Sequence, residues 1–246
     1  MERRSARKCS GLWDEVSRLA ASVTMLTAII VAGGSSRRMG FDKTFALLAD
    51  KPVIAHTIAA FASASCVGEI IIVGRAERLD ELRELAPTHR VVAGGVHRQD
   101  SVAAGLAALT PACRYVAVHD AARPLVTTNA ILRVLEAAQT HGAAALAAPI
   151  TDTLKRADAD HFVTEAVDRD GVFAMQTPQI FARDLLEEAY ARIVAAGLTV
   201  TDEVSAVEQL GRKVILVPND KPNPKITFPA DLALAELLLA GRAACA

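Results

Sequence analysis

Residues 28–43 read AIIVAGGSSRRMGFDK, and this stretch decides the fold. Its first four residues, 28–31, are apolar and typical of a buried strand, which the Gly-Gly-Ser-Ser turn at 33–36 ends. Such a turn brings backbone N–H groups close to an anion, and phosphate is the anion that we expect. Two arginines and Lys43 follow, and cations suit the negative charge that develops during phosphoryl or nucleotidyl transfer. The stretch therefore predicts a loop that holds a nucleoside triphosphate.

The loop differs from two familiar phosphate-binding motifs. No Gly-Lys-Ser/Thr closes it, as a Walker A motif requires, and the order Gly-Gly-Ser-Ser-Arg at 33–37 is not Gly-x-Gly-x-x-Gly. Both differences weaken a kinase or a dehydrogenase interpretation. A strand, a glycine turn and a basic helix start also occur together in many α/β proteins, so the remainder of the chain has to decide.

Length and composition indicate one globular domain. The chain has 246 residues, 52% of them hydrophobic, with 27 basic and 28 acidic side chains. This apolar content is ample for a core, and the balanced charge does not favour nucleic acid as a partner. Phosphate binding must therefore come from local clusters of charge. We expect the domain to span 25–246, after a poorly ordered extension at 1–24.

The distribution of cysteines and apolar residues indicates a cytoplasmic protein. The four cysteines are far apart and form no Cys-x-x-Cys pair, so neither a zinc site nor a disulfide framework is expected. No apolar run approaches the roughly 18 residues that span a bilayer. Charged residues interrupt 1–24, which therefore does not match a signal peptide.

Apolar runs alternate with helical patterns along the rest of the chain. Strands are expected at 69–74, 90–95, 115–118, 143–149 and 213–218. Helices are expected at 52–61, 79–85, from 98 onward, and at 130–139, 182–196, 201–208 and 229–239. Asp100 or Ser101 would cap the helix near 98, and the acidic start of the helix at 201–208 suits the helix dipole. The alternation predicts an α/β fold with a doubly wound, mostly parallel sheet.

Residues 150–170 break this alternation. Two stretches with strand character bracket a polar turn at 157–161, which predicts a hairpin that projects from the sheet as an arm. An arm of this kind often serves an oligomer.

Asp120 and Arg123 are the strongest candidates for chemistry. Asp120 follows the expected strand at 115–118, and ligands of open α/β sheets bind at the carboxyl ends of strands. A carboxylate there suits Mg²⁺, which is usually held by one or two carboxylates and the phosphates of a substrate. The planar fork of Arg123 can grip a phosphate at two places. Considered alone, an aspartate after a strand is a turn or cap residue as often as it is a metal ligand.

Further candidates are basic or small residues near other turns. Arg38 and Lys43 suit a pentavalent phosphorus transition state and the departing pyrophosphate. A second corner, built from Gly94, Gly95, Arg98 and Ser101, either reads the edge of a base or is an ordinary capped turn. Three more cations suit a phosphate-bearing substrate or are surface charges: Lys155, Arg156 and Lys225.

The motifs considered together are more specific than any one of them. They are AGGSSRRM at 32–39, Lys43, Gly94-Gly95 with RQDSV at 98–102, HDAARP at 119–124, DTLKR at 152–156, VDR at 167–169, QTPQ at 176–179, TDE at 201–203 and KIT at 225–227. The set resembles the 2-C-methyl-D-erythritol 4-phosphate cytidylyltransferase family, the third enzyme of the non-mevalonate isoprenoid pathway. The HDAARP run joined to the DTLKR arm is its most specific part.

The resemblance implies a Rossmann-like fold of the nucleotide-diphospho-sugar transferase type, a homodimer with exchanged arms, and a reaction that needs Mg²⁺ or another divalent cation. The phosphate of methylerythritol phosphate, a polyol phosphate, would attack the α-phosphorus of CTP directly. The resemblance assigns nucleotide binding to Ala32, Gly33, Gly34, Ser35, Ser36, Gly95, Arg98, Ser101 and Ala121. It assigns catalysis to Arg38, Lys43, Asp120 and Arg123, Mg²⁺ to Asp120, and the acceptor to Arg123, Asp152, Arg156 and Lys225, with Arg156 coming from the partner.

Some positions depart from the family pattern. Residues 222–225 read Pro-Asn-Pro-Lys where the family often has Asp-Asn-Ile-Lys, so no acid stands at position 222 as a second carboxylate for the metal, and either Asp220 substitutes for it or none does. Ala166 and Val96 stand where a threonine and an acid are found in other members. The nearest alternatives are ribitol-5-phosphate cytidylyltransferase, a molybdopterin nucleotidyltransferase, and a nucleotide-binding subunit without activity.

Overall fold

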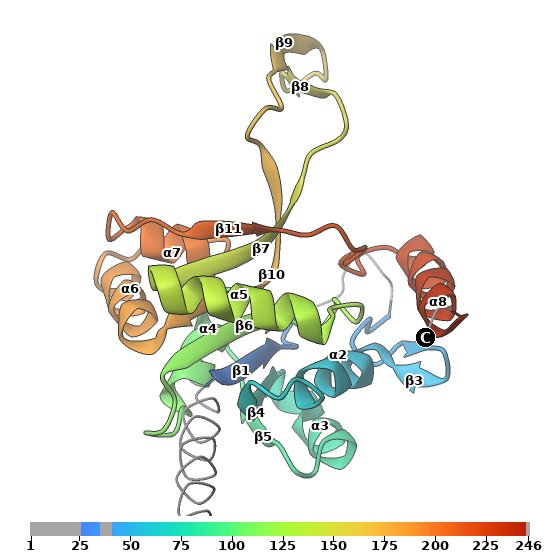
Figure 1. The fold of residues 1–246 in the computed structure, drawn as a ribbon, viewed down its shortest axis with the longest axis vertical. Helices are drawn as coiled ribbons and strands as arrows, with labels where there is room; N and C mark the ends of the chain where they lie inside the picture. Colours follow the sequence, from blue (N-terminus) through green and yellow to red (C-terminus); the bar gives the residue numbers. More distant parts are fainter. Residues whose placement is uncertain (1–25, 35–40, 245–246) are drawn as a thin grey trace, which may run out of the picture.

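The computed structural model describes residues 26–34 and 41–244, and these form an α/β body with a projecting arm (Figure 1). A seven-stranded sheet runs through the body in the order β11-β7-β10-β6-β1-β4-β5. Its strands are β1 (Leu26–Val31), β4 (Val67–Gly74), β5 (Arg90–Ala93), β6 (Tyr115–Asp120), β7 (Ala143–Pro149), β10 (Phe173–Ala182) and β11 (Ile215–Pro218). The stretch that was expected to decide the fold supplies the central strand, β1.

The sheet is mostly parallel, as the sequence predicts. β1 pairs in parallel with β4 and β6, β4 with β5, and β7 with β11. β10 is antiparallel to both of its neighbours, β6 and β7. The chain enters β10 from the arm rather than from a crossover helix, and a strand reached by a hairpin-like return runs antiparallel.

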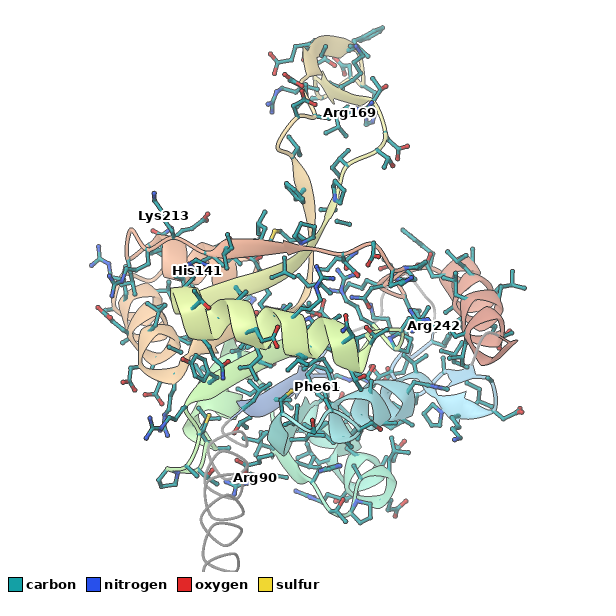
Figure 2. All side chains as sticks on the ribbon, in the orientation of Figure 1. Phe61, Arg90, His141, Arg169, Lys213 and Arg242 are labelled. Carbon is teal, nitrogen blue, oxygen red and sulfur yellow. The ribbon has the colours of Figure 1, made fainter. Side chains whose placement is uncertain are left out.

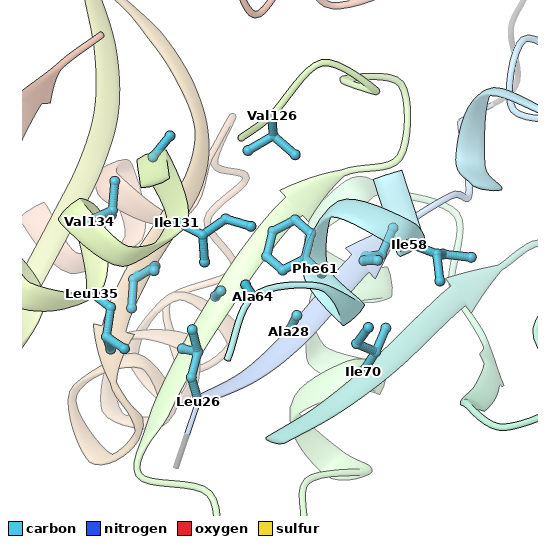
Figure 3. Packing of buried hydrophobic residues seen from close by; sticks show 14 of the residues in the cluster. Leu26, Ala28, Ile58, Phe61, Ala64, Ile70, Val126, Ile131, Val134 and Leu135 are labelled. Atoms are coloured by element: carbon cyan, nitrogen blue, oxygen red, sulfur yellow. The ribbon is translucent and has the colours of Figure 1, made fainter. Parts of the chain in front are cut away.

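Helices cover both faces of the sheet, so it is doubly wound. The helices are α2 (Val53–Ala62), α3 (Leu79–Leu85), α4 (Arg98–Ala107), α5 (Thr128–His141), α6 (Arg183–Ala195), α7 (Glu203–Glu208) and α8 (Pro229–Ala244). Buried residues of α2, α3 and α5 pack on one face, where Phe61 lies among Ile58, Ala28 and Ile131 (Figure 3). Buried residues of α4, α6 and α7 pack on the other face. Strands buried on both sides explain the continuous apolar runs in the sequence.

Local signals in the sequence explain where several helices begin and end. The Thr127 hydroxyl accepts a hydrogen bond from the Ala130 N–H at the start of α5, and Gly142 ends that helix with φ +83°. The predicted cap of α4 is wrong by a few residues. His97 is the N-cap residue, and Asp100 acts from the third helical position by accepting the His97 N–H at 2.9 Å.

The predicted arm lies at the expected place. β8 (Leu154–Ala157) and β9 (Val163–Val167) form a separate antiparallel pair that extends away from the body (Figure 1). The chain leaves the sheet at Pro149 and returns at Phe173, and these two residues pair directly. The arm is therefore an excursion between two neighbouring strands of one sheet.

Two features near the C-terminus and the first loop lay outside the sequence prediction. A short hairpin of β2 (Leu47–Leu48) and β3 (Lys51–Pro52) contacts α8, and a small apolar cluster joins them. Two-residue strands are too short to produce a periodic pattern.

Within 26–34 and 41–244, no helix combines the length and the apolar character needed to cross a membrane.

Candidate active site

The candidate site lies at the carboxyl ends of the parallel strands, where open α/β sheets bind ligands. Gly33 and Gly34 follow β1, Gly95 follows β5, and Asp120 is the last residue of β6. A cavity of about 400 Å³ opens between these strand ends. It is lined by Val31, Ala32, Gly33, Gly34, Lys43, Thr44, Gly95, Val96, His97, Arg98, Ser101, Asp120, Ala121, Ala122 and Lys225.

The glycine corner after β5 is closely packed against the start of α4. A Cβ on Gly94 would lie 2.5 Å from the Ser101 hydroxyl oxygen, and one on Gly95 would lie 2.3 Å from Cβ of Asp100. Side chains at either position would therefore force the corner apart. The absence of side chains leaves the backbone of this corner accessible from the cavity.

Asp120 lies at the centre of a cluster of cations. Its Oδ2 is 2.8 Å from Nζ of Lys225 and 3.6 Å from Nε of Arg123, and its Oδ1 is 3.3 Å from Nε of Arg98. Burial alone would raise the pKa of the Asp120 carboxyl. The charges of Arg98 and Lys225 outweigh the burial and hold this pKa well below its usual range. Asp120 is therefore ionised at neutral pH.

Arg98 is held from its other side by a residue whose role the sequence did not reveal. Glu203 is fully buried at the start of α7, and its two carboxylate oxygens bind Nη1 and Nη2 of Arg98 at 2.5 and 3.0 Å. The Tyr190 hydroxyl donates to the same carboxylate at 3.0 Å. The acidic start of this helix was interpreted as a match to the helix dipole. Asp202 does cap α7, but the Glu203 carboxylate turns inward to Arg98.

Lys43 reaches the cavity from the loop that follows residues 35–40. Its Nζ donates to the Ile226 carbonyl at 2.9 Å. The neighbouring Asp42 accepts the Thr44 N–H at 3.0 Å and forms an ion pair with Arg75 at 2.5 Å. These contacts shape the turn that carries Lys43.

A second cavity of about 280 Å³ lies on the other side of the same cluster. It is lined by Arg98, Asp120, Arg123, Met175, Gln176, Thr177, Gln179, Thr201, Asp202 and Lys225. Arg98, Asp120 and Lys225 line both cavities. The arrangement can therefore hold two anionic ligands that meet beside one carboxylate.

His119 is buried behind Asp120 and is held by two hydrogen bonds. Its Nε2 is 3.2 Å from the Arg123 carbonyl oxygen, and its Nδ1 is 3.0 Å from the Thr177 hydroxyl oxygen. Burial lowers the pKa of His119 to about 3, so the imidazole is neutral. The phenyl ring of Phe61 packs at 4.9 Å from its ring centre.

The structure does not bring every predicted residue to this cluster. Asp152 and Arg156 lie on the arm, exposed, and Arg156 forms an ion pair with Glu165 of the neighbouring strand. Three other predicted residues lie outside the described part of the chain: Ser35, Ser36 and Arg38. Gly94 lines neither cavity, and Lys155 lies on the arm, exposed. The other candidates line one or both cavities: Ala32, Gly33, Gly34, Lys43, Gly95, Arg98, Ser101, Asp120, Ala121, Arg123 and Lys225.

The donor set was also tested for a divalent cation. In the described ranges, no three side chains of histidine, cysteine, aspartate or glutamate gather as a metal centre would require. Mg²⁺ is commonly held by only one or two carboxylates, with phosphate oxygens and water as its other ligands. Asp120 is ionised and accessible from both cavities, so the residues present fit a cation that binds together with phosphates.

Fold and site together define the class. A glycine-lined cavity with cations and one ionised carboxylate at the carboxyl ends of the strands of an α/β sheet suits a nucleotidyltransferase. The model of one family, described as 2-C-methyl-D-erythritol 4-phosphate cytidylyltransferase, matches residues 26–241. The chain belongs to this family, and the resemblance of its motifs is thereby confirmed.

Known proteins agree with this assignment over nearly the whole chain. The 2-C-methyl-D-erythritol 4-phosphate cytidylyltransferase of Dehalococcoides mccartyi strain CBDB1 is 40% identical over 219 residues, which cover 86% of this chain and 95% of the relative. The enzyme of the same name from Symbiobacterium thermophilum is 42% identical, and the matched residues cover 87% of this chain and 92% of the relative. The crystal structure of the 4-diphosphocytidyl-2C-methyl-D-erythritol synthase of Anaerococcus prevotii superposes with a TM-score of 0.78. The two sequences are 30% identical, and the match covers 88% of this chain and 99% of the other chain.

Proposed function

We propose that this chain transfers the cytidylyl group of CTP to 2-C-methyl-D-erythritol 4-phosphate, in the non-mevalonate pathway to isoprenoids. The products are 4-diphosphocytidyl-2-C-methyl-D-erythritol and pyrophosphate. One observation carries this proposal beyond family membership: two cavities share Arg98, Asp120 and Lys225, so a nucleotide and an acceptor phosphate can meet at one point.

CTP occupies the larger, glycine-lined cavity. The backbone after β1, from Ala32 to Gly34, and the adjoining Ser35 and Ser36 hold the triphosphate and ribose. Gly95 and Ser101 lie at the far corner, where the cytosine binds against the start of α4 and Ala121 closes the cavity wall. Backbone N–H groups at such turns suit phosphate oxygens.

The acceptor occupies the smaller cavity. Arg123 and Lys225 bind its phosphate, which is held next to the α-phosphorus of CTP. An oxygen of that phosphate attacks the α-phosphorus, a P–O bond forms, and the bond to the departing pyrophosphate breaks. Arg38 and Lys43 stabilise the charge that builds up on the phosphoryl oxygens. Holding both reactants in line accounts for much of the rate of such transfers.

Asp120 would hold a divalent cation that binds together with the triphosphate. Such a cation would supply positive charge to the phosphate oxygens. Lys225 and Arg98, which contact the Asp120 carboxylate, keep it ionised and ready to bind the cation.

A second copy of the chain completes the acceptor cavity. The arm lies away from its own cavities and carries exposed apolar side chains, Phe162 and Val163, that a partner can cover (Figure 1). Asp152 and Arg156 of one copy then reach the acceptor of the other, in a homodimer with exchanged arms. Arg156 is the arm residue that we assign to the acceptor phosphate.

The function is tested by measuring pyrophosphate release from each of the four nucleoside triphosphates. We expect release with CTP and methylerythritol phosphate together, and little with ATP, GTP or UTP. Ribitol 5-phosphate is assayed in parallel. Faster turnover with ribitol 5-phosphate would indicate the sibling activity, and no release with any pair would indicate a nucleotide-binding protein without activity.

We expect Arg156→Ala to raise the KM for methylerythritol phosphate about tenfold, which corresponds to one charge-assisted hydrogen bond of about 1.5 kcal/mol. The KM for CTP should stay near the wild-type value, because the glycine-lined cavity belongs to the same chain. Arg169→Ala is the matched comparison, since it removes the other arginine of the arm, whose position Figure 2 shows. If only Arg169→Ala raises the KM, the arm contributes but the assignment to Arg156 is wrong. If neither does, the arm has no role in binding the acceptor.

A further inference from the structure

Four buried or partly buried residues behind the catalytic cluster form a closed ring of hydrogen bonds. Nδ1 of His119 contacts the Thr177 hydroxyl at 3.0 Å, and Nε2 of His119 contacts the Arg123 carbonyl at 3.2 Å. Nη1 of Arg123 donates to the Asn223 carbonyl at 2.8 Å. Nδ2 of Asn223 closes the ring by donating to the Thr177 carbonyl at 3.0 Å.

The chemistry of the partners fixes where the protons lie. The Arg123 carbonyl can only accept, so Nε2 of His119 carries the hydrogen. Nδ1 of the neutral imidazole then accepts from the Thr177 hydroxyl. The same hydroxyl oxygen accepts the Asp120 N–H at 3.1 Å. Each polar group at the junction of His119, Thr177 and Asp120 therefore has a partner of the right kind.

Burial makes this ring rigid. His119, Thr177 and Asn223 are 0%, 4% and 3% exposed, so water cannot readily replace their contacts. A polar group left without a partner at such a place costs about 1–3 kcal/mol. Breaking the contacts of His119 and Thr177 is therefore costly, while Oδ1 of Asn223 has no hydrogen-bond partner in the described part of the chain.

The ring joins three segments that are distant in the sequence and that each carry or adjoin part of the catalytic cluster. His119 and Arg123 flank Asp120 at the end of β6, Thr177 lies on β10, and Asn223 is two residues before Lys225. The Nζ of Lys225 in turn contacts Asp120. A shift of any one segment would move a charged group relative to the other two.

We propose that His119 and Thr177 are positioning residues, which set the geometry of Asp120, Arg123 and Lys225 for the transfer step. They act through the backbone of the turn after β6. His119 lines neither cavity, and Thr177 lines the smaller cavity, where its hydroxyl is bound to His119 and Asp120. This role rests on the proposed cytidylyl transfer. Small errors in the position of catalytic groups lower the rate more than they lower binding of a nucleotide held by a separate loop.

Thr177→Val and Thr177→Ser form the matched pair that tests this role. Valine keeps the shape of the side chain but removes the hydroxyl, whereas serine keeps the hydroxyl. We expect Thr177→Val to lower kcat roughly 10- to 100-fold. The KM for CTP should change less than about threefold, because Thr177 does not line the nucleotide cavity. Thr177→Ser should restore most of kcat.

Thr27→Val controls for the loss of a buried threonine hydroxyl as such. Thr27 is also buried, but it lies near the amino end of the central strand β1, away from the carboxyl strand ends that form the site, and its hydroxyl contacts Glu69. We expect it to lower the melting temperature without lowering kcat. His119→Gln is a second way to break the ring, since it can keep a donor for the Arg123 carbonyl while it loses the imidazole Nδ1 that accepts from Thr177.

The outcomes distinguish a failure of the positioning role from a failure of the proposed cytidylyl transfer. Wild-type kcat in folded Thr177→Val, or in folded His119→Gln should the first variant not fold, would overturn the positioning role. Equal losses in Thr177→Val and Thr177→Ser would overturn it too. A wild-type protein that releases no pyrophosphate from CTP would instead overturn the proposed function, and the role of the ring with it.

Discussion

Asp120→Asn is expected to lower kcat for cytidylyl transfer at least ~100-fold while the variant still binds CTP. Asparagine keeps the size of the side chain but lacks the charge that would hold a divalent cation between the two cavities. The cations around it remain, and Lys225 loses its 2.8 Å contact with a carboxylate. The phosphates of CTP can then occupy this positive region in place of the carboxylate. Steady-state pyrophosphate release measures kcat, and calorimetry measures CTP affinity.

The decisive observation for Asp120→Asn is that kcat falls while the affinity for CTP is retained. A parallel loss of CTP affinity would mean that Asp120 binds the nucleotide equally in the ground state and in the transition state. Turnover within a few-fold of wild type would contradict the role of Asp120 altogether. Thermal unfolding of the same sample excludes a loss of fold as the cause.

Glu203→Gln is expected to lower the free energy of unfolding by about 3–5 kcal/mol, although Glu203 lies outside both cavities. Glutamine keeps the size and one acceptor oxygen, but the Arg98 guanidinium loses the buried carboxylate that binds its two terminal nitrogens. Arg98 is partly buried, with 25% of its side chain exposed, and keeps Asp120, but without the Glu203 carboxylate it retains much of the cost of leaving water. For a chain of this length the melting temperature should fall by roughly 10 °C. Calorimetry or circular dichroism measures the shift.

Two further variants identify the cause of this loss. Tyr190→Phe removes one hydrogen bond to Glu203 but leaves the ion pair, so we expect a cost of only about 1 kcal/mol. Replacing both charges, as in Arg98→Met with Glu203→Leu, should recover much of the stability because no unpaired charge remains. A Glu203→Gln variant as stable as wild type would show that Asp120 alone balances Arg98.

Much of the fold follows from the sequence because the sheet is buried on both faces. Apolar runs such as 143–149 become strands with the expected bounds, and the polar break at 150–170 becomes the arm. β10 (Phe173–Ala182) was not expected as a strand, because the polar QTPQ at 176–179 interrupts its apolar residues, and its antiparallel direction was not predicted either. Direction depends on how the chain returns from the arm, which is a property of the tertiary fold.

The position of a residue after a strand predicted part of the site, and the resemblance to the family supplied the roles of other residues, such as Lys225. Asp120 lies where an acid after a strand is expected, and Lys43 follows the first loop. Glu203 was missed because an acid at a helix start has an ordinary local explanation. Its actual partner, Arg98, is 105 residues away in the sequence, and no local pattern links the two. The role of His119 was hidden for a similar reason, since its partner Thr177 lies on another strand.

The junction between Pro149 and Phe173 has a consequence for how this architecture can diversify. Because these two residues pair with each other, β7 and β10 are joined directly beneath the arm, and the one irregularity in their pairing lies further along, between Met175 and Gln179. The pairing of β7 with β10 in the body therefore does not depend on the length of the arm between them. An arm of another length would leave the pairing of β7 with β10 intact, whereas changes at Asp152 or Arg156 would alter the part of the arm that we assign to the acceptor.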